Sequence, residues 1–273
     1  MGGARKKVID CTGDANLVKM LGYPILTSEE IQPATYVNRL EGYNIDEVNE
    51  EEVGAAFNKA IADGYLDESL FSWKKPYKML SQGKLDMHLP CSDADTSAGK
   101  TQVELDAHEV LMRMIATFRK IKGCENLKVS IFAAECGIRE TCRIEGEEIM
   151  DSSRYLSGYV YDDAISYVYY PVDVHHMNGI RHENIEKNKI PTIPYRALIP
   201  KRSKNLLIAG RTVSSDRDTN SAVRVQAPCM AMGTAVGVAA AIAARKNIGV
   251  AEVDYRELAS SLKKLGATLP EKN

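Results

Sequence analysis

The hydrophobic and polar positions along this chain predict a mixture of amphipathic helices and short strands. Apolar residues recur at helical spacing over residues 53–61, after a capping box of Asn49 and Glu52, and over residues 110–121, before Gly123. Short apolar or β-branched runs predict strands over residues 6–10, 126–134, 167–174, 193–199 and 205–209. This order of elements indicates an α/β protein.

Three further features complete the pattern. Residues 65–100 are rich in Gly, Pro, Ser, Asp and Lys, and predict loops with short strands. A capping box of Asp254 and Glu257 predicts a helix near the end of the chain. Near its start, Asp14 is expected to cap a helix whose first apolar residue is Leu17.

Residues 193–244 carry the most information about function. A predicted strand over residues 205–209 runs into Gly210 and Arg211, and a polar loop of Ser, Asp, Thr and Asn follows. A long helix of Ala, Gly, Val and Met then begins, with Pro228 in its first turn, where the missing N–H has no effect. This order of elements brings backbone close to a flat, phosphate-bearing cofactor.

The same helix, residues 227–244, has a competing interpretation as a membrane span. It carries no charged residue and reaches the usual lower limit of about 18 residues. Its composition is only weakly apolar, whereas spanning helices are rich in Leu, Ile, Phe and Val. The mean hydropathy of the chain is −0.27. A buried helix is therefore favoured, one whose small residues let a sheet or ligand approach, and no membrane partner is expected.

Composition narrows the classes of protein. A chain of 273 residues can hold one large domain or two small ones. The net charge of −2 and the pI of about 6.3 favour neither nucleic acid nor an anionic membrane as a partner. The first residues lack the apolar core of a signal peptide, so a cytoplasmic location is expected.

Six cysteines are present, and none belongs to a Cys-x-x-Cys pair. Neither a zinc site nor an iron–sulfur cluster is expected, and we predict reduced, mostly buried thiols. The five histidines lack the spacing of metal ligands, so no metal site is predicted.

The first candidate site is the turn Thr12-Gly13-Asp14 at the end of the first strand. Proteins of the α/β class place nucleotides at such strand ends. The signal is weak by itself, because any turn from a strand to a helix favours Gly and Asp.

The second candidate is the pair Arg139 and Arg143, which alternates with Glu140 along a possible strand. Two guanidinium groups on one face can clamp a carboxylate or a phosphate. The alternative is that Arg139 and Glu140 are simply ion-paired with neighbouring residues.

The third candidate is Asp173-Val174-His175-His176. Adjacent histidines on a strand point to opposite faces, so they cannot both face one site. One of them, with Asp173, could act as a general acid or base, because imidazole titrates near neutral pH.

Five blocks of sequence resemble one protein family in their order along the chain. They are VIDCTGDANLVKMLG, AECGIRETCRIEGEEIM, DDAISYVYYPVDVHH, IPYRALIPKRSKNLLIAGR and SAVRVQAPCMAMGTAVGVAAA. Together they resemble the FAD-dependent oxidoreductases grouped with heterodisulfide reductase A-like flavoproteins, among the glutathione-reductase-like flavoenzymes. The resemblance covers nearly the whole chain.

The resemblance implies a role for each matching position. Thr12, Gly13 and Asp14 match a turn beside the adenosine and pyrophosphate half of FAD. Gly210 and Arg211 match a turn near the ribityl and pyrophosphate groups. The segment beside the isoalloxazine is matched by Arg224, Val225, Met230, Gly233, Thr234 and Ala235. Arg139, Glu140 and Arg143 match an arginine-rich block on the substrate side, with Cys142 where a further Arg is usual. His175 matches an Asp-x-His position.

One departure from the family is large. The family begins with a strand and a Gly-x-Gly-x-x-Gly turn that holds the FAD pyrophosphate, and this sequence contains no such turn. We therefore expect the chain to correspond to the C-terminal portion of a flavoenzyme and to bind FAD weakly or not at all by itself. The alternative is a non-catalytic fragment or subunit that needs a separate N-terminal half.

These observations give one prediction of fold and function. The fold class is α/β, with a partial Rossmann-like, glutathione-reductase-type FAD-binding domain in residues 1–31 and 191–250. A mixed α+β substrate or cap domain is inserted at residues 32–190, and residues 251–273 form a C-terminal helix and tail. The predicted function is an FAD-dependent oxidoreductase acting on an unidentified small molecule. A missing N-terminal half or an electron-transfer protein would be its partner.

Overall fold

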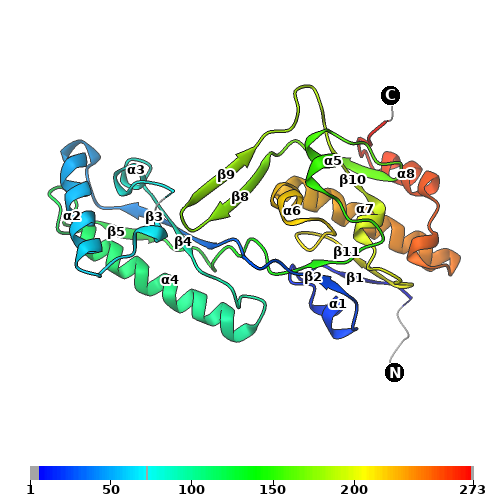
Figure 1. Ribbon diagram of the computed structural model, residues 1–273, viewed down its shortest axis with the longest axis horizontal. Coiled ribbons are helices and arrows are strands. Elements are labelled where there is room, and N and C mark those ends of the chain that lie inside the picture. The colour runs from blue at the N-terminus through cyan, green and yellow to red at the C-terminus, as the bar shows by residue number, and fades with distance from the viewer. Residues whose placement is uncertain (1–5, 72, 272–273) are drawn as a thin grey trace. The chain divides into compact units, whose positions relative to one another are not determined.

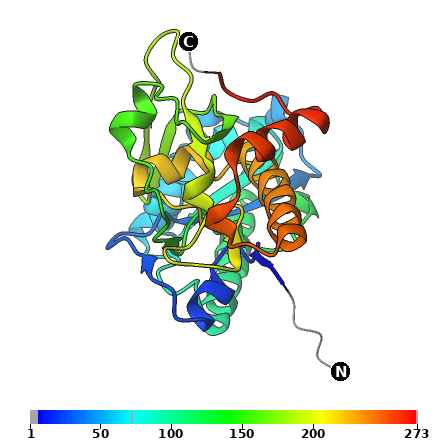
Figure 2. The same cartoon turned by 90° about the vertical axis from the view of Figure 1, so that its right-hand side faces the viewer.

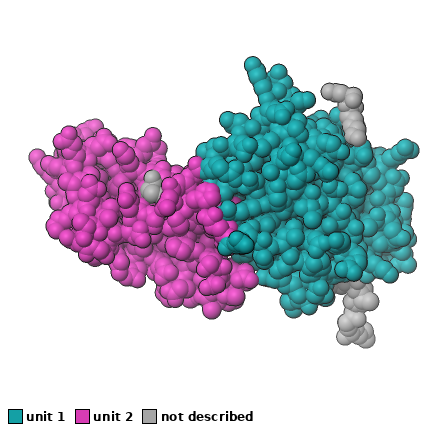
Figure 3. Space-filling view, viewed as in Figure 1, with its two compact units in different colours: residues 1–29, 140–174, 181–273 teal, residues 30–139, 175–180 magenta. Residues whose placement is uncertain are grey.

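The computed structural model describes residues 6–71 and 73–271 as a mixed α/β protein. The chain divides into two compact units (Figure 3). Unit 1 combines residues 1–29, 140–174 and 181–273, and unit 2 combines residues 30–139 and 175–180. Each unit has its own hydrophobic core.

Unit 1 contains small sheets and helices drawn from three separate stretches of the chain. Its strands are β1 (Val8–Asp10), β2 (Ile25–Leu26), β6 (Arg143–Ile144), β7 (Ala164–Tyr167), β10 (Thr192–Pro194) and β11 (Leu206–Ile208). Its helices are α1 (Asn16–Met20), α5 (Ser152–Leu156), α6 (Arg217–Val223), α7 (Gln226–Lys246), α8 (Tyr255–Lys264) and the 3-10 turns η3 (Tyr195–Leu198) and η4 (Val250–Glu252).

The strands β1 and β11 form a parallel pair in unit 1. Val8 lies opposite Leu206 and Asp10 lies opposite Ile208, so both strands end at the same edge. The long helix α7 contacts both strands, and its buried residues include Met232, Ala235 and Val236. Figures 1 and 2 both show α8 alongside α7, which places α8 in the same core.

The short helix α1 is capped by a side chain from β1. Its N-cap residue, Ala15, has a left-handed backbone (φ 52°) and no capping side chain. The buried Asp10 carboxylate instead accepts the backbone N–H groups of Leu17 (2.9 Å) and Val18 (3.1 Å), and its other oxygen accepts two bonds from Thr12. The expectation that Asp14 caps this helix is therefore wrong, because Asp14 is buried in other contacts.

Unit 2 is built on an antiparallel sheet with the strand order β4-β3-β5. Its elements are β3 (Ala34–Glu41), η1 (Ile45–Glu47), α2 (Glu50–Ala62), η2 (Glu68–Leu70), α3 (Pro76–Ser81), β4 (Lys84–Leu89), α4 (Ser97–Phe118) and β5 (Lys128–Ile131). Alternate residues of β3, such as Tyr36 and Leu40, are buried in the core that includes Phe57, Leu111 and Phe118 of the helices. One face of the sheet thus packs on helices, as period-two alternation requires.

The hairpin of β8 (Val172–His176) and β9 (Gly179–Glu183) begins in unit 1, and its turn belongs to unit 2. The segment 140–174 packs into the core of unit 1 through residues such as Ile144, Tyr155 and Ile165. The compact units therefore divide the chain differently from the inserted domain expected at residues 32–190. The functional labels given to those domains stay predictions.

Most helices and strands follow the sequence pattern, with clear exceptions. The predicted helix of residues 110–121 begins much earlier, at Ser97, where the side chain of Thr96 accepts the N–H of Gly99. The strand predicted over residues 167–174 divides into β7 and β8, and residues 195–198 form η3 rather than a strand. Residues 65–100, expected as loops and short strands, contain α3 and the six-residue strand β4.

The helix α7 is long and apolar enough to cross a membrane by length and composition alone, within the part of the chain that the structure describes. Its buried face contacts β1, β7, β11 and α8. A core helix of a globular unit makes contacts of the same kind with the strands and helices around it.

Candidate functional site

The turns that follow β1 and β11 meet at the carboxyl end of the parallel pair. The backbone N–H of Ala209 donates to the carbonyl of Asp10 (3.1 Å), so the chain leaves both strands side by side. Beyond this point, the Arg211 guanidinium donates to Asp14 (2.5 Å), and the hydroxyl of Thr141 donates to the same carboxylate oxygen (2.9 Å). The structure thus brings together the predicted cofactor residues of the two turns.

Glycine is required in both turns. Gly13 has φ +78°, and a Cβ there would lie 3.1 Å from the guanidinium carbon of Arg211. Gly210 has φ +102°, and no atom lies within 4 Å of the position that its Cβ would take. The backbone at Gly210 is therefore accessible to a ligand at close range, which is the property a cofactor-binding turn needs.

Polar atoms around Arg211 fit a phosphate- and hydroxyl-bearing cofactor. Asn220 of α6 donates through Nδ2 to the carbonyl of Arg211 (2.8 Å). Within the described residues, Nε of Arg211 and Oδ1 of Asn220 are buried and form no hydrogen bond. A buried donor and a buried acceptor beside one turn can serve a phosphate oxygen and a ribityl hydroxyl, so the residues present fit this part of FAD.

The amino terminus of α7 adds positive potential to unit 1. The helix begins at Gln226, and its N-cap residue Val225 provides no capping side chain. Its first N–H groups and the helix dipole favour negative charge in front of the helix. Arg224, just before it, faces inward instead: its Nη2 donates to the carbonyl of Asp173 (3.3 Å), and burial lowers its pKa against the opposing effect of Glu140.

The other predicted flavin-side residues lie along α7. Met230 is 74% exposed, and Gly233 and Thr234 are also exposed. Ala235 is fully buried in the core of unit 1. Three of the four positions are thus on the exposed face of the helix, whereas the side chain of Ala235 packs inward.

Arg143 is a buried ion-paired residue. Its guanidinium donates to the carbonyl of Ser215 (3.0 Å) and lies 3.7 Å from Glu140, which Arg217 approaches to 3.2 Å from the other side. Burial lowers the pKa of Arg143, and the charge of Glu140 counteracts this effect. For Glu140, the alternative of ion pairing with neighbouring residues is therefore the arrangement observed.

The expected strand through Arg139 and Arg143 is wrong. Strand β6 contains only Arg143 and Ile144, because the residues before it connect two compact units. Arg139 belongs to unit 2, where its guanidinium donates to the carbonyl of Pro33. Arg139 and Arg143 therefore do not share a strand, and their roles toward a substrate stay predictions.

The side chains of Asp173 and the two histidines have separate partners. Asp173 accepts from the hydroxyl of Tyr170 (3.1 Å) and lies 3.4 Å from the ring of His182. The ring of His175 lies 3.2 Å from that of His88, while the ring of His176 lies 3.1 Å from Glu30. His175 and His176 therefore contact different residues, as expected for adjacent side chains that point to opposite faces of a strand.

His88 is the chemically notable residue that the sequence does not reveal. It is fully buried on β4, and its ring stacks on Trp73 with centroids 5.1 Å apart. Burial, followed by the charges of Arg139 and His175, lowers the pKa of His88 from 6.5 to about 4. No sequence signal marks it, because a single histidine in a Gly- and Lys-rich stretch has no partner in the sequence.

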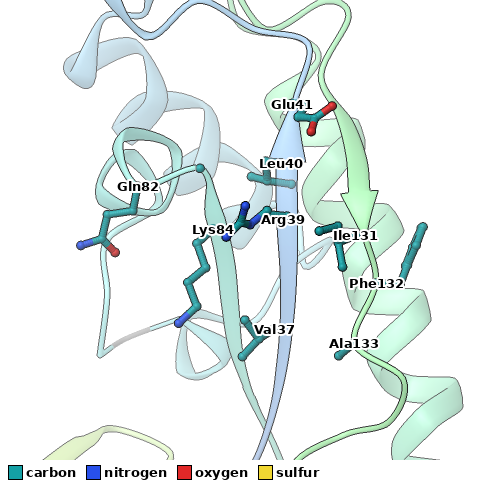
Figure 4. Close-up of a pocket in the computed structure, with 10 residues that line it drawn as sticks. Val37, Arg39, Leu40, Glu41, Gln82, Lys84, Ile131, Phe132 and Ala133 are labelled. Atoms are coloured by element: carbon teal, nitrogen blue, oxygen red, sulfur yellow. The ribbon is translucent and has the colours of Figure 1, made fainter.

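A pocket of about 630 Å³ lies on unit 2 beside the edges of β3, β4 and β5. Figure 4 shows Val37 and Arg39 on β3, Lys84 on β4, and Ile131 with Phe132 along the β5 segment. None of the predicted site residues lines it. The glycine-bearing turns and this pocket are therefore separate features.

The described residues contain no group of three or more His, Cys, Asp or Glu side chains that could hold a metal ion. Four of the six cysteines are buried, as predicted, and Cys11 is exposed beside the first turn. Although Cys11 is exposed, partial desolvation of its thiol, followed by the charge of Asp10, raises its pKa.

Glycine-bearing turns at the carboxyl ends of parallel strands are typical of α/β proteins that bind nucleotide cofactors. The chain matches the family model described as FAD dependent oxidoreductase over residues 5–262. It therefore belongs to the FAD-dependent oxidoreductase family, which confirms the resemblance at this level. No curated protein and no solved structure matches the chain.

Proposed function

We propose that unit 1 forms the part of an FAD site that contacts the ribityl, pyrophosphate and isoalloxazine groups. The observation that carries this proposal is the convergence of the turns at residues 12–14 and 210–211 through the Asp14–Arg211 ion pair. Buried polar atoms of Arg211 and Asn220 supply hydrogen-bonding capacity at the same place. When bound, the flavin would supply the transfer of electrons.

The residues of the chain would bind and orient the cofactor. Arg211 and the turn at Gly210 would contact the phosphate and ribityl groups, with Arg211 held in place by Asp14. The amino terminus of α7 would favour negative charge on the isoalloxazine through its N–H groups and its dipole. Met230, Gly233 and Thr234 would lie on the side of the helix that the cofactor covers.

The substrate-side residues of the proposal are Arg139 and His175 of unit 2. Arg139 would orient an anionic group of the substrate, and the ring of His175 would accept or donate a proton. Arg143 is buried among Glu140, Ser215 and Ser28. We therefore propose for Arg143 a supporting role behind the site rather than contact with the substrate.

A second candidate function is favoured by the exposed side of unit 1. Strand β1 pairs with one neighbour, β11, among the strands that the structure describes, and parallel strands are usually buried in larger sheets. The face of α7 that carries Ala227, Met230, Gly233 and Gly237 is also exposed. A further segment or subunit that supplies a Gly-x-Gly-x-x-Gly turn would complete the sheet and the pyrophosphate site.

The finer assignment follows from the same resemblance. We propose a heterodisulfide reductase A-like flavoprotein acting in the cytoplasm on a small molecule, with a separate electron-transfer partner. The feature of unit 1 that supports a Rossmann-like sheet is the parallel pairing of β1 with β11.

The visible spectrum of the purified chain with added FAD tests both candidates. A red-shifted, structured flavin band that stays with the protein after gel filtration would support FAD binding by the chain alone. Retention of flavin only after a polypeptide with the Gly-x-Gly-x-x-Gly unit is added would support the second candidate. Absence of bound flavin under both conditions would overturn the proposed site. Arg211→Met is the matched variant, because it removes the charge and keeps much of the side-chain volume.

A further inference from the structure

The face of the sheet in unit 2 that points away from the helices carries a row of two cations and an apolar side chain. On β3, Arg39 is exposed while Leu40, the next residue, is buried in the core, so Arg39 lies on the outer face. Lys84 lies directly across from Arg39 on β4, and Ile131 lies across from it on β5. Residues directly across an antiparallel pair share a face. All three therefore border the pocket of about 630 Å³ on this sheet (Figure 4).

The charges of the two cations are balanced unequally. Nζ of Lys84 lies 3.1 Å from Oδ2 of Asp86, which Lys74 also approaches, at 3.4 Å. Among the residues that the structure describes, no carboxylate lies within ion-pair distance of Arg39. Like charges directly across a strand pair destabilise the sheet. An anion bound beside Arg39 would relieve this repulsion.

One further acid lies on the same face of β3. Glu41 follows Arg39 by two positions, and Lys128 of β5 lies directly across from Glu41. Opposite charges in such a position attract each other, so Glu41 is offset by a cation of its own. The charged groups of this face therefore leave a small excess of positive charge, which suits a ligand with a single negative charge.

The other part of the pocket is apolar. Ile131 is 57% exposed and Phe132 is 53% exposed, and both line the pocket together with Val37 and Ala133. Sites for small molecules usually combine apolar walls with a few polar groups that fix the orientation of the ligand. A guanidinium group presents paired N–H donors that match the two oxygens of a carboxylate.

We propose that this pocket of unit 2 binds a small carboxylate with an apolar body. The carboxylate accepts hydrogen bonds from the guanidinium of Arg39, and Lys84 adds positive potential. The apolar body lies against Val37 and Ile131. The pocket uses none of the residues assigned to the flavin, so this proposal does not rest on the proposed function, and its test needs no flavin.

The test is a titration of the full chain, labelled at its isoleucine methyl groups, followed by ¹H–¹³C NMR. The signal of Ile131 is assigned by its loss in Ile131→Val. Phenylpropanoate is the probe, and we expect it to shift this signal with a Kd on the order of 1 mM or tighter. Phenylpropanamide keeps the shape and lacks the charge, and acetate keeps the charge and lacks the apolar body. Each should bind about tenfold more weakly or not at all.

The variants test the role of Arg39. Arg39→Gln should weaken the binding of phenylpropanoate about tenfold or more and abolish its advantage over the amide, whereas Arg39→Lys should keep part of that advantage. Arg113→Gln is the matched control, because Arg113 is also a partly exposed arginine of unit 2 but pairs with Glu109 on α4 and does not line the pocket. It should leave the affinity unchanged.

Three results would each overturn the proposal. The first is an Ile131 signal that phenylpropanoate does not shift. The second is equal affinity for phenylpropanoate and its amide in the wild-type chain, and the third is unchanged affinity in Arg39→Gln. Inorganic phosphate is titrated in parallel, and a response to phosphate without one to phenylpropanoate would also refute an amphipathic carboxylate as the ligand. If Arg39→Gln does not fold, the comparison of acid and amide in the wild-type chain decides.

Discussion

Asp14 and Arg211 are 197 positions apart in the sequence, yet their side chains form an ion pair with a distance of 2.5 Å. The Asp14 side chain is 1% exposed and that of Arg211 is 26% exposed. The pair joins the turn after β1 to the turn after β11. It therefore orients the one guanidinium group that we assign to the cofactor's phosphate region.

Asp14 and Arg211 should be energetically coupled, so that replacing both destabilises unit 1 by less than the sum of the two single losses. Arg211→Met leaves the Asp14 carboxylate buried with the Thr141 hydroxyl, and we expect a loss of roughly 2–4 kcal/mol in the free energy of unfolding. The double variant Asp14→Asn/Arg211→Met should lose less than the sum of the two single variants. Urea denaturation of the four proteins measures this coupling, and strictly additive losses would contradict it.

Asp10 should be the most sensitive acidic residue near the first turn. Its carboxylate accepts four hydrogen bonds, two from Thr12 and two from the first turn of α1. Asp10→Ala leaves these donors without their acceptor, and we expect a loss of about 2–4 kcal/mol. Asp254→Ala is the control, because Asp254 caps α8 with one bond to the N–H of Arg256 and should lose only about 1 kcal/mol. Equal losses by chemical denaturation would contradict the role of Asp10.

Local signals in the sequence were sufficient for much of the fold. The long helix α7, the cap of α2 at Asn49 and the cap of α8 at Asp254 follow from composition and capping residues. The cap of α1 could not be predicted, because its acceptor lies on the preceding strand rather than at the N-cap position. The early start of α4 was hidden because its first residues are polar and lack an apolar stripe.

The site was predicted only in part for a similar reason. The two glycine turns are local motifs, and their meeting follows from the parallel pairing of their strands. The arginine clamp was expected from alternation, but alternation holds only within a strand, and β6 begins at Arg143. His88 became notable only through Trp73 and His175, which tertiary structure brings to it.

The stability of the protein should depend on pH through His88. The pKa of His88 is about 4 in the folded chain and its ordinary value is 6.5, so between these pH values the unfolded chain binds a proton that the folded chain does not. Stability should therefore rise as the pH increases from about 4 to about 6.5, by roughly 2–3 kcal/mol from this group.

The measurement compares denaturation curves of the wild-type chain and His88→Gln across this pH range. Carboxylates titrate in both proteins, so the difference between the two pH profiles isolates His88. We expect a flatter profile for His88→Gln. Parallel profiles would show that the ring of His88 is not held in its neutral form by folding.

Glycines on the exposed face of α7 provide a test that separates stability from cofactor binding. Gly233 and Gly237 lie within the helix, and a Cβ at either position meets no atom within 4 Å. Alanine at each position should therefore raise the free energy of unfolding of this chain by roughly 0.5–1 kcal/mol, as helix propensity predicts. If flavin or a further segment packs closely against this face, the same methyl groups should weaken that association by about 1–3 kcal/mol, or roughly 5- to 150-fold.

Gly54→Ala on α2 is the matched control, because Gly54 also lies within a helix and its Cβ would meet no atom within 4 Å. It should raise stability by a similar amount and leave flavin binding unchanged. Melting temperatures and flavin retention are measured for all three variants. Tighter or equal flavin retention in Gly233→Ala and Gly237→Ala would show that the cofactor does not cover this face. The assignment of the α7 surface to the flavin would then fail, while the Asp14–Arg211 turn site would remain to be judged by its own variants.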